Sequence, residues 1–329
     1  MQSILVTGGA GYIGSHACKM LREAGFEPVC YDNFSKGWEA AVKFGPLVRG
    51  DVRDREGLVQ AMKVHNIEAV MHFAALSEVG VSTQDPGSYY ENNVFGSLQL
   101  FRAMIDAGIN KIVFSSTCAV YGESDGELLT EESRKHPINP YGRTKLMVET
   151  ILADMDTSHK LKSHVMRYFN VAGADEHAEI GEHHVPETHL IPLVLDAAIG
   201  RREAIKIFGT DYATPDGTCI RDYIHVMDLI EAHIASLKLL LGGAESDAFN
   251  LGTGVGFSVR EIIDEVAVVT GADILRVEET RRPGDPAFLV SGATKALETL
   301  RWTPHRSKLN RVIRDAWRWH RKGGYPTVT

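Results

Sequence analysis

The sequence predicts an α/β protein with a Rossmann-type doubly wound parallel sheet and a smaller α/β substrate-binding domain. Short apolar strands alternate with helical stretches over residues 4–168, a glycine-rich turn separates the first strand from the first helix, and shorter elements with polar loops follow. Strands joined by helical crossovers form a parallel sheet, which binds ligands at the carboxyl ends of its strands. We expect domains of residues 1–173 and 174–329, with some later segments returning to the first.

The composition is that of an ordinary globular chain of 329 residues, with 44% apolar residues and a net charge of −8. This acidic balance argues against a nucleic-acid partner. The chain enters its first strand without a charged leader, and no apolar run reaches the about 18 residues of a membrane span. We therefore expect a cytoplasmic protein with no membrane partner. Its four widely spaced cysteines favour neither a disulfide framework nor a zinc site.

The glycine-rich turn is the first candidate binding site. A strand at residues 4–7 runs into Gly8-Gly-Ala-Gly11-Tyr-Ile-Gly14, and a helix continues to about residue 24. In such a unit one glycine allows the tight turn, one lets the backbone approach a pyrophosphate, and one lets the helix pack against the strand. The helix N-terminus then presents N–H groups to phosphate. We predict a dinucleotide site here.

An acid follows the second strand at the expected place. Residues 28–31 form a strand that ends in Asp32, where a carboxylate binds the 2′-hydroxyl of the adenosine ribose. The same carboxylate would repel the 2′-phosphate of NADP, so NAD is favoured. Lys36 is near enough in sequence to keep NADP open.

The next β-α units extend the predicted sheet. A strand end at residues 47–52 places Asp51 near the adenine, and a helix at 55–64 precedes a buried strand at 69–75. We interpret His72, near the end of that strand, as a structural histidine with satisfied hydrogen bonds.

Small residues and hydroxyl groups follow two of these strands. Ala74 and Ala75 would let a cofactor pass close to the sheet. A helix over residues 88–107 leads to a strand at 111–114, which ends in Ser115-Ser-Thr117. The Thr117 hydroxyl would share the ligand crevice.

The motif Tyr141-Gly-Arg-Thr-Lys145 is the candidate catalytic pair. Asn139 is a good N-cap and Pro140 suits the first helical position, so a helix begins here. Residues four apart share a helix face, and a nearby cation lowers the pKa of a tyrosine, which makes Tyr141 a candidate general base. The alternative is a half-buried tyrosine beside a solvated lysine that pairs with Glu149.

The second half of the chain has shorter elements. After a strand at residues 161–168, we expect two further strands and four helices; the strands are at 204–208 and 248–251, and the helices are at 186–199, 227–241, 258–270 and 307–319. Four histidines in the first polar loop match no metal motif, so we expect a solvated loop and no metal; they are His177, His183, His184 and His189.

Two basic points in this acidic chain suggest a second phosphate site. They are Arg221 and the pair Arg281-Arg282, and the planar guanidinium suits phosphate oxygens. Surface salt bridges with Asp222 or Asp285 are the alternative.

Together these motifs resemble the extended short-chain dehydrogenase/reductase superfamily, and most closely its UDP-glucose 4-epimerases. The resemblance runs in the expected order from the first residues to about Trp319. The motifs are Thr7-Gly-Gly-Ala-Gly-Tyr-Ile-Gly14, Asp32-Asn33, Thr117, Tyr141-x-x-x-Lys145, Arg167-Tyr-Phe-Asn170, Arg221-Asp-Tyr-Ile-His-Val and Arg282-Pro-Gly-Asp285.

The resemblance implies tightly bound NAD, resting as NAD+, and the substrates UDP-glucose and UDP-galactose. Tyr141, Lys145 and Thr117 would be catalytic. The implied cofactor-binding residues are Gly8, Gly11, Tyr12, Ile13, Gly14, Asp32, Asn33, Asp51, Val52, Phe73, Ala74, Ala75, Asn92, Ser115, Tyr141, Lys145 and Tyr168. The implied substrate-binding residues are Thr117, Tyr141, Asn170, Leu190, Phe208, Arg221, Arg282 and Asp285. A homodimer through the helix at residues 88–107 and the Tyr141 helix is also implied.

Two departures bear on this expectation. Ser77 stands where many members of the family carry a lysine that contacts the cofactor, and Leu289 falls near the position that selects for the C2 substituent of the sugar. Other UDP-sugars therefore stay open: N-acetylhexosamines, pentoses and uronates.

The same motifs leave three other activities to consider: a dehydratase, a net oxidoreductase and a non-catalytic regulator. A 4,6-dehydratase would need an acid/base pair after Thr117, where Cys118-Ala119 stand. A net oxidoreductase exchanging free NADP(H), or a non-catalytic NAD-binding regulator, are further alternatives. The regulator should have lost Tyr141, Lys145 or Thr117, and all three are present.

Overall fold

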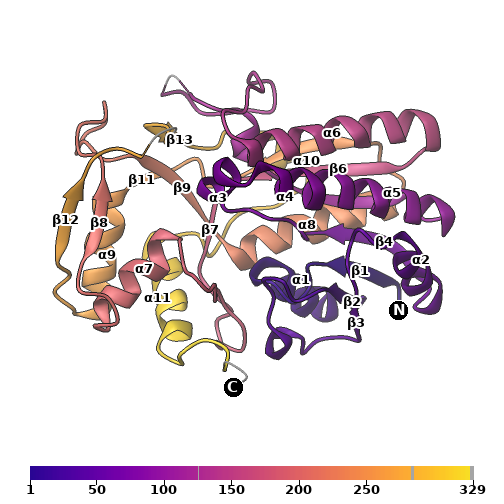
Figure 1. Cartoon of the computed structure of the whole chain (residues 1–329), viewed down its shortest axis with the longest axis horizontal. Coiled ribbons are helices and arrows are strands. Elements are labelled where there is room, and N and C mark those ends of the chain that lie inside the picture. The colour runs from indigo at the N-terminus through magenta and orange to yellow at the C-terminus, as the bar shows by residue number, and fades with distance from the viewer. Residues whose placement is uncertain (125, 283–284, 327–329) are drawn as a thin grey trace.

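The computed structural model describes residues 1–124, 126–282 and 285–326. Its centre is a seven-stranded sheet, parallel throughout, with the order β10-β6-β5-β4-β1-β2-β3 (Figure 1). The strands are β1 (Ser3–Thr7), β2 (Glu27–Asp32), β3 (Leu47–Arg49), β4 (Ile67–His72), β5 (Lys111–Thr117), β6 (Lys162–Tyr168) and β10 (Asp247–Leu251). The order reverses between β1 and β4, as in a doubly wound sheet, and the predicted Rossmann-type fold is confirmed.

Helices cover both faces of this sheet, each over its own hydrophobic cluster. On one face lie α1 (Tyr12–Glu23) and α8 (Val226–Leu241). On the other lie α2 (Arg55–Val64), α5 (Gly96–Asp106) and α6 (Pro140–His159). Burial of both faces explains why the strands have nearly continuous apolar runs.

The predicted helix over residues 88–107 is a composite in the structure. After α3 (Val79–Gln84), the chain forms α4 (Pro86–Tyr89), a π-helix at Tyr90–Phe95 and then α5. Within the wider turn, the Asn93 amide donates to the Leu76 carbonyl at 2.9 Å, and its oxygen accepts from the Leu76 N–H at 2.8 Å. The π-helix thus ties down the loop that follows β4.

A second group of strands follows β6 and lies beside the main sheet (Figure 1). One small sheet centres on β9 (Ile220–His225), which pairs with β7 (Asn170–Ala172), β11 (Gly256–Ser258) and β13 (Phe288–Leu289). A two-stranded sheet joins β8 (Ile205–Phe208) to β12 (Arg276–Glu279). Of these strands the sequence predicted only β8.

The helices of this second group are α7 (Leu190–Ala198), α9 (Val259–Thr270) and α11 (Leu309–His320), which share one core. The prediction that α7 begins at residue 186 is wrong. The N–H groups of Thr188 and His189 donate to the Glu187 carboxylate at 2.7 and 2.8 Å, so the chain is still turning there and the helix begins at Leu190.

The two halves of the chain are interleaved. Helix α8 and strand β10 come from the second half but belong to the main sheet, against which α10 (Thr294–Thr299) also packs. The remaining short elements are two 3-10 helices, η1 (Glu39–Ala41) and η3 (Cys118–Val120). Within the described residues, no helix is long and apolar enough to cross a membrane.

Candidate functional site

The turn between β1 and α1 has the shape that a dinucleotide requires. Gly8 has a φ of +73°, and a Cβ on it would lie 2.7 Å from the Ala74 nitrogen. A Cβ on Gly14 would lie 2.1 Å from the Gly8 oxygen, whereas one on Gly11 would meet that oxygen at 3.3 Å. Gly8 and Gly14 are therefore needed for the protein's own packing, whereas a Cβ on Gly11 would meet no other part of the described chain within 4 Å.

Tyr12 and Ile13 begin α1 directly after this turn and are half-buried. The Tyr12 hydroxyl donates to the Gly173 carbonyl at 2.7 Å, at the last residue of the first predicted domain.

Asp32 is fixed beside the same turn, at the end of β2. Its two carboxylate oxygens accept from the N–H groups of Ala10, at 2.9 Å, and Phe34, at 2.8 Å. Burial raises the pKa of Asp32, and these two hydrogen bonds oppose the shift. Lys36 points elsewhere, because its ammonium pairs with Glu78 at 3.0 Å. The carboxylate is therefore held in place by backbone groups.

Further predicted residues lie at the neighbouring strand ends. The Asn33 amide donates to the Asp51 carboxylate at 2.9 Å, and Val52 is buried next to it. Arg53 and Asn33 lower the pKa of Asp51 through hydrogen bonds. The Asn92 amide donates to Asn93 at 3.0 Å, at the start of the next helix.

The segment after β4 carries the half-buried Phe73, Ala74 and Ala75, followed by the exposed Ser77. His72 bonds to the hydroxyls of Thr7, at 2.6 Å, and Ser97, at 3.0 Å, and burial lowers its pKa to about 3. The interpretation of His72 as a structural histidine is confirmed.

Tyr141 and Thr117 meet at the end of β5. The Asn139 side chain caps α6 by accepting from the Gly142 N–H at 2.8 Å, as predicted, which places Tyr141 in the first turn. Tyr141 is buried, the nearby Thr117 side chain acts to lower its pKa, and its ring lies edge-on to Tyr89. Two hydroxyl groups thus share one buried position.

Lys145, one turn further along α6, is directed at the sheet. Its ammonium donates to the Ser115 carbonyl at 2.8 Å, and the Ser115 hydroxyl hydrogen-bonds to that of Tyr168. Since Thr117 pairs with Tyr168 in the register of β5 and β6, the predicted catalytic residues and these two cofactor candidates lie together.

The prediction that Lys145 lowers the pKa of Tyr141 is wrong for the protein alone. Burial raises the pKa of Tyr141 above its usual value, and the hydrogen bond with Thr117 offsets only part of the shift. Burial also lowers the pKa of Lys145 to about 7. The Lys145 ammonium lies 6.0 Å from the centroid of the Tyr141 ring, with its hydrogen bond aimed at Ser115. The surroundings of Tyr141 in the protein alone therefore do not favour its phenolate form, and a further positive charge near the phenol is needed to lower its pKa.

The alternative of a solvated Lys145 paired with Glu149 is also wrong. Lys145 is buried, and Glu149 forms a buried ion pair with Arg167 at 2.7 Å while accepting from the Ser116 hydroxyl at 2.5 Å. The sequence reasoning missed this pair, although an arginine in a buried strand such as β6 signals that a buried acid lies nearby. The pair fixes α6 against β5 and β6.

The residues predicted to form a second phosphate site lie in β9 and in the segment after β12. Arg221 is buried and donates to the Asp285 carboxylate at 2.5 Å, and Arg282 stacks on Phe208, with its guanidinium 3.8 Å from the ring centroid. Asp222 instead accepts from the N–H groups of Thr253 and Gly254. Of the two carboxylates considered as salt-bridge partners of Arg221, it is therefore Asp285 that pairs with it. Pro283 and Gly284 of the motif lie outside the described residues.

Three more residues border this region. Leu289 pairs with Arg221 across β13 and β9, and Asn170 begins β7, which pairs with the later residues of β9. Leu190 begins α7 and is half-buried.

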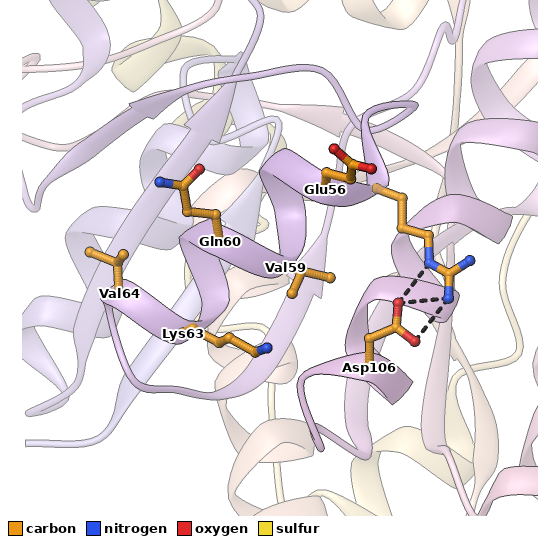
Figure 2. Close-up of a pocket in the computed structure, with 7 residues that line it drawn as sticks. Glu56, Val59, Gln60, Lys63, Val64 and Asp106 are labelled. Carbon is orange, nitrogen blue, oxygen red and sulfur yellow. Dashed lines mark hydrogen bonds and ion pairs between the residues drawn. The ribbon is translucent and has the colours of Figure 1, made fainter.

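A separate groove lies between α2 and the end of α5 (Figure 2). There Arg55 donates twice to Asp106, at 2.7 and 2.8 Å, among Glu56, Gln60 and Lys63. None of the predicted site residues lines it. We therefore do not place the chemistry in this groove.

Comparison with known proteins agrees with the geometry. The model of the NAD dependent epimerase/dehydratase family matches residues 4–252. The chain is 51% identical to a UDP-glucose 4-epimerase of Rhizobium leguminosarum bv. trifolii, with 98% of each chain covered. UDP-glucose 4-epimerase from Brucella ovis, solved in complex with NAD, is 45% identical and superposes with a TM-score of 0.94 over 97% of this chain and 98% of that one.

A UDP-glucose 4-epimerase from Stenotrophomonas maltophila, solved with bound NAD and formylated UDP-arabinopyranose, superposes with a TM-score of 0.95 at 40% identity, covering 98% of this chain and 99% of that one. These matches confirm the resemblance, and the chain belongs to the NAD dependent epimerase/dehydratase family.

Proposed function

We propose that this protein interconverts UDP-glucose and UDP-galactose by inverting C4 through a transient 4-keto sugar. The observation that carries the proposal is the burial of Tyr141, in the first turn of α6, beside Thr117 at the end of β5. The names and bound ligands of the relatives support the same reaction.

The cofactor would lie along the carboxyl ends of the main sheet. Gly8, Gly11 and Gly14 would admit its pyrophosphate, and Asp32 would accept from its adenosine ribose. When bound, NAD would take hydride from C4 and return it to the opposite face, and its positively charged ring would lower the pKa of Tyr141. The remaining proposed contacts are Tyr12, Ile13, Asn33, Asp51, Val52, Phe73, Ala74, Ala75, Asn92, Ser115, Tyr141, Lys145 and Tyr168.

The chain's own part in the chemistry is proton transfer. Tyr141 would take the proton of the sugar 4-hydroxyl and give it back to the same oxygen. The Thr117 hydroxyl would hydrogen-bond to that oxygen. Lys145 would hold the nicotinamide ribose while its bond to Ser115 keeps α6 in register with β5.

The nucleotide part of the substrate would be held more firmly than the sugar. Arg221 and Arg282 would bind the pyrophosphate, with Asp285 and Phe208 holding the two guanidinium groups in place. Asn170 and Leu190 would complete the UDP contacts. No comparable cluster of charges grips the hexose among the described residues that we assign, so the keto sugar could turn within the site.

A dehydratase is disfavoured by the residues after Thr117. Burial raises the pKa of the Cys118 thiol to about 12, and Ala119 has no acid or base. Neither residue could eliminate water.

We further propose a cytoplasmic homodimer. The four cysteines are all free and buried, which suits a reducing compartment. Phe95 and Met147, both about half exposed, lie on the two segments expected to form the dimer. Light scattering coupled to gel filtration would give twice the chain mass of 36.2 kDa if the dimer forms.

The function is tested by NMR of the purified protein with UDP-galactose, UDP-N-acetylgalactosamine and UDP-arabinose in separate reactions. We expect UDP-galactose to reach equilibrium with UDP-glucose without added cofactor. Faster turnover of another UDP-sugar would identify that sugar as the preferred substrate. Leu289, which pairs with Arg221, would then be the first residue to substitute in a test of sugar selectivity. Stoichiometric consumption of added NAD or NADP would indicate a net oxidoreductase instead.

A further inference from the structure

Four side chains that the proposed reaction does not use converge in the loop between β7 and α7. One ligand atom from each of Glu182, His184, Glu187 and His189 lies within 4.8 Å of all the others. The His189 Nδ1 atom lies 2.9 Å from Glu182 and 3.0 Å from Glu187. The His184 Nδ1 atom lies 3.3 Å from Glu182 and 3.5 Å from Glu187. Each of the two imidazole nitrogens therefore lies close to both carboxylates.

The spacing matches the ligand shell of a zinc ion. Zinc binds imidazole nitrogen and carboxylate oxygen at about 2.0 to 2.2 Å, so two ligands of a tetrahedral ion lie about 3.3 to 3.6 Å apart. The four nitrogen-to-oxygen distances in the cluster run from 2.9 to 3.5 Å, which is close to that edge. All four ligand atoms lie within 4.8 Å of one another, so the side chains would draw together around an ion.

His184 gives an independent indication. Its Nδ1 atom is buried, yet nothing in the described part of the chain forms a hydrogen bond with it, although two carboxylates are within 3.5 Å. Buried polar atoms normally have a partner. A nitrogen close to two acceptors but aligned with neither is placed as a ligand of an atom between them.

Charge and ligand type select the metal. A metal ion would displace the protons of both imidazoles, and the two carboxylates would then carry a charge of about −2, which a divalent cation neutralises. Imidazole favours zinc over magnesium and calcium, which prefer shells of oxygen. We propose that Glu182, His184, Glu187 and His189 form a structural zinc site. With four protein ligands the site is closed, so its ion binds no substrate.

The ion would link two segments: the backbone at residues 182–183, which is held by two indole groups, and the start of α7. The Trp319 indole donates to the Glu182 carbonyl at 2.8 Å, and the Trp38 indole donates to the His183 carbonyl at 2.8 Å. His189, at the other end of the loop, directly precedes α7 and Leu190. The metal site does not rest on the proposed function.

The test is metal binding to the untagged full-length protein. Protein stripped with a chelator and dialysed would be titrated with Zn²⁺ or Mg²⁺ in a calorimeter, and its zinc content measured by mass spectrometry. We expect one tightly bound Zn²⁺ per chain, no binding of Mg²⁺ at the same concentrations, and a rise in melting temperature with zinc. Absence of stoichiometric zinc binding by the wild-type protein would overturn the proposal and leave a network of ion pairs.

Matched variants locate the ion. His184→Gln and Glu182→Gln should each weaken zinc binding by on the order of 100-fold or more, since even outer-shell changes cost about 10- to 100-fold. His177→Gln is the control, because His177 is exposed in the same loop but outside the cluster. Circular dichroism of the metal-free variants would establish that they fold. Wild-type zinc affinity in both cluster variants would refute the site, whatever the epimerase assay gives.

Discussion

The Lys145 ammonium donates a 2.8 Å hydrogen bond to the carbonyl oxygen of Ser115. This bond joins α6 to β5 one helical turn beyond Tyr141, beside the buried pair of Glu149 and Arg167. Lys145 therefore helps to position Tyr141 by fixing α6, the helix that carries both residues, against β5. The Thr117 side chain is the neighbour that acts to lower the pKa of the phenol, against the larger effect of burial.

Replacing Tyr141 by phenylalanine should separate chemistry from folding. The ring would keep its edge-on contact with Tyr89, but the group that takes the sugar proton would be lost. We expect turnover to fall by on the order of 10²-fold or more, with unchanged NAD content and melting temperature. Near-normal turnover in a coupled assay would exclude Tyr141 as the general base.

Arg282 and its neighbour Arg281 form a natural pair of variants. Arg282 stacks on Phe208 in the proposed pyrophosphate site, whereas Arg281 donates to Asp211 at 2.6 Å. Arg282→Ala should weaken UDP binding by about 10- to 100-fold, as expected for a charged hydrogen bond of about 1.5 to 3 kcal/mol, and should leave NAD content unchanged. Arg281→Ala should have a much smaller effect. Equal UDP affinities by calorimetry in both variants would show that the pyrophosphate site is misassigned.

The glycine turn can be tested with two glycine-to-alanine changes. A Cβ on Gly14 would lie 2.1 Å from the Gly8 oxygen, whereas one on Gly80, in the exposed α3, would meet nothing within 4 Å. Gly14→Ala should lower the melting temperature and deplete bound NAD, because the strand and helix must separate. Gly80→Ala should keep the wild-type melting temperature and NAD content. Wild-type NAD content in Gly14→Ala, read from the absorbance of the released nucleotide, would contradict the proposed turn geometry.

His233 should make the protein sensitive to acid. Burial lowers its pKa from 6.5 to about 4, and its Nε2 atom is buried without a hydrogen-bond partner among the described residues. Between these two pH values the unfolded chain binds a proton that the folded protein does not, so stability falls as the pH drops from about 6.5 to about 4. The slope from this residue is about 1.4 kcal/mol per pH unit.

His233→Phe would remove that slope. Between pH 7 and pH 5 the wild-type protein should lose about 2 kcal/mol more stability than the variant. Urea unfolding at the two pH values measures the difference, and the exposed His177→Phe is the control. Equal losses in wild type and His233→Phe would mean that His233 is protonated in the folded protein.

Much of the sheet and its ligand edge could be predicted from the sequence, because the signals are local. Asn139 caps α6 as expected, and Ser258 with Glu261 forms a capping box at the start of α9. The glycine turn and Asp32 follow their strands at the predicted distance.

Features that depend on distant partners could not be predicted. Strand β9 was missed because its partners β7, β11 and β13 are short and far apart in the chain. The direction of the Tyr141 pKa shift depends on burial, which helix periodicity does not reveal. The polar loop with the histidines was expected to be solvated, yet the Glu182 side chain is only 8% exposed, because Trp319 and α7 pack around that loop.

The most direct test of the account is to convert UDP-galactose in D₂O and to examine the product by proton NMR. Hydride that leaves C4 for the bound cofactor and returns to the same carbon does not exchange with solvent. We therefore predict UDP-glucose that carries protium at C4. Deuterium at C4 would mean that the hydrogen leaves as a proton, and absence of conversion would mean that the protein does not invert this centre; either result would contradict the account.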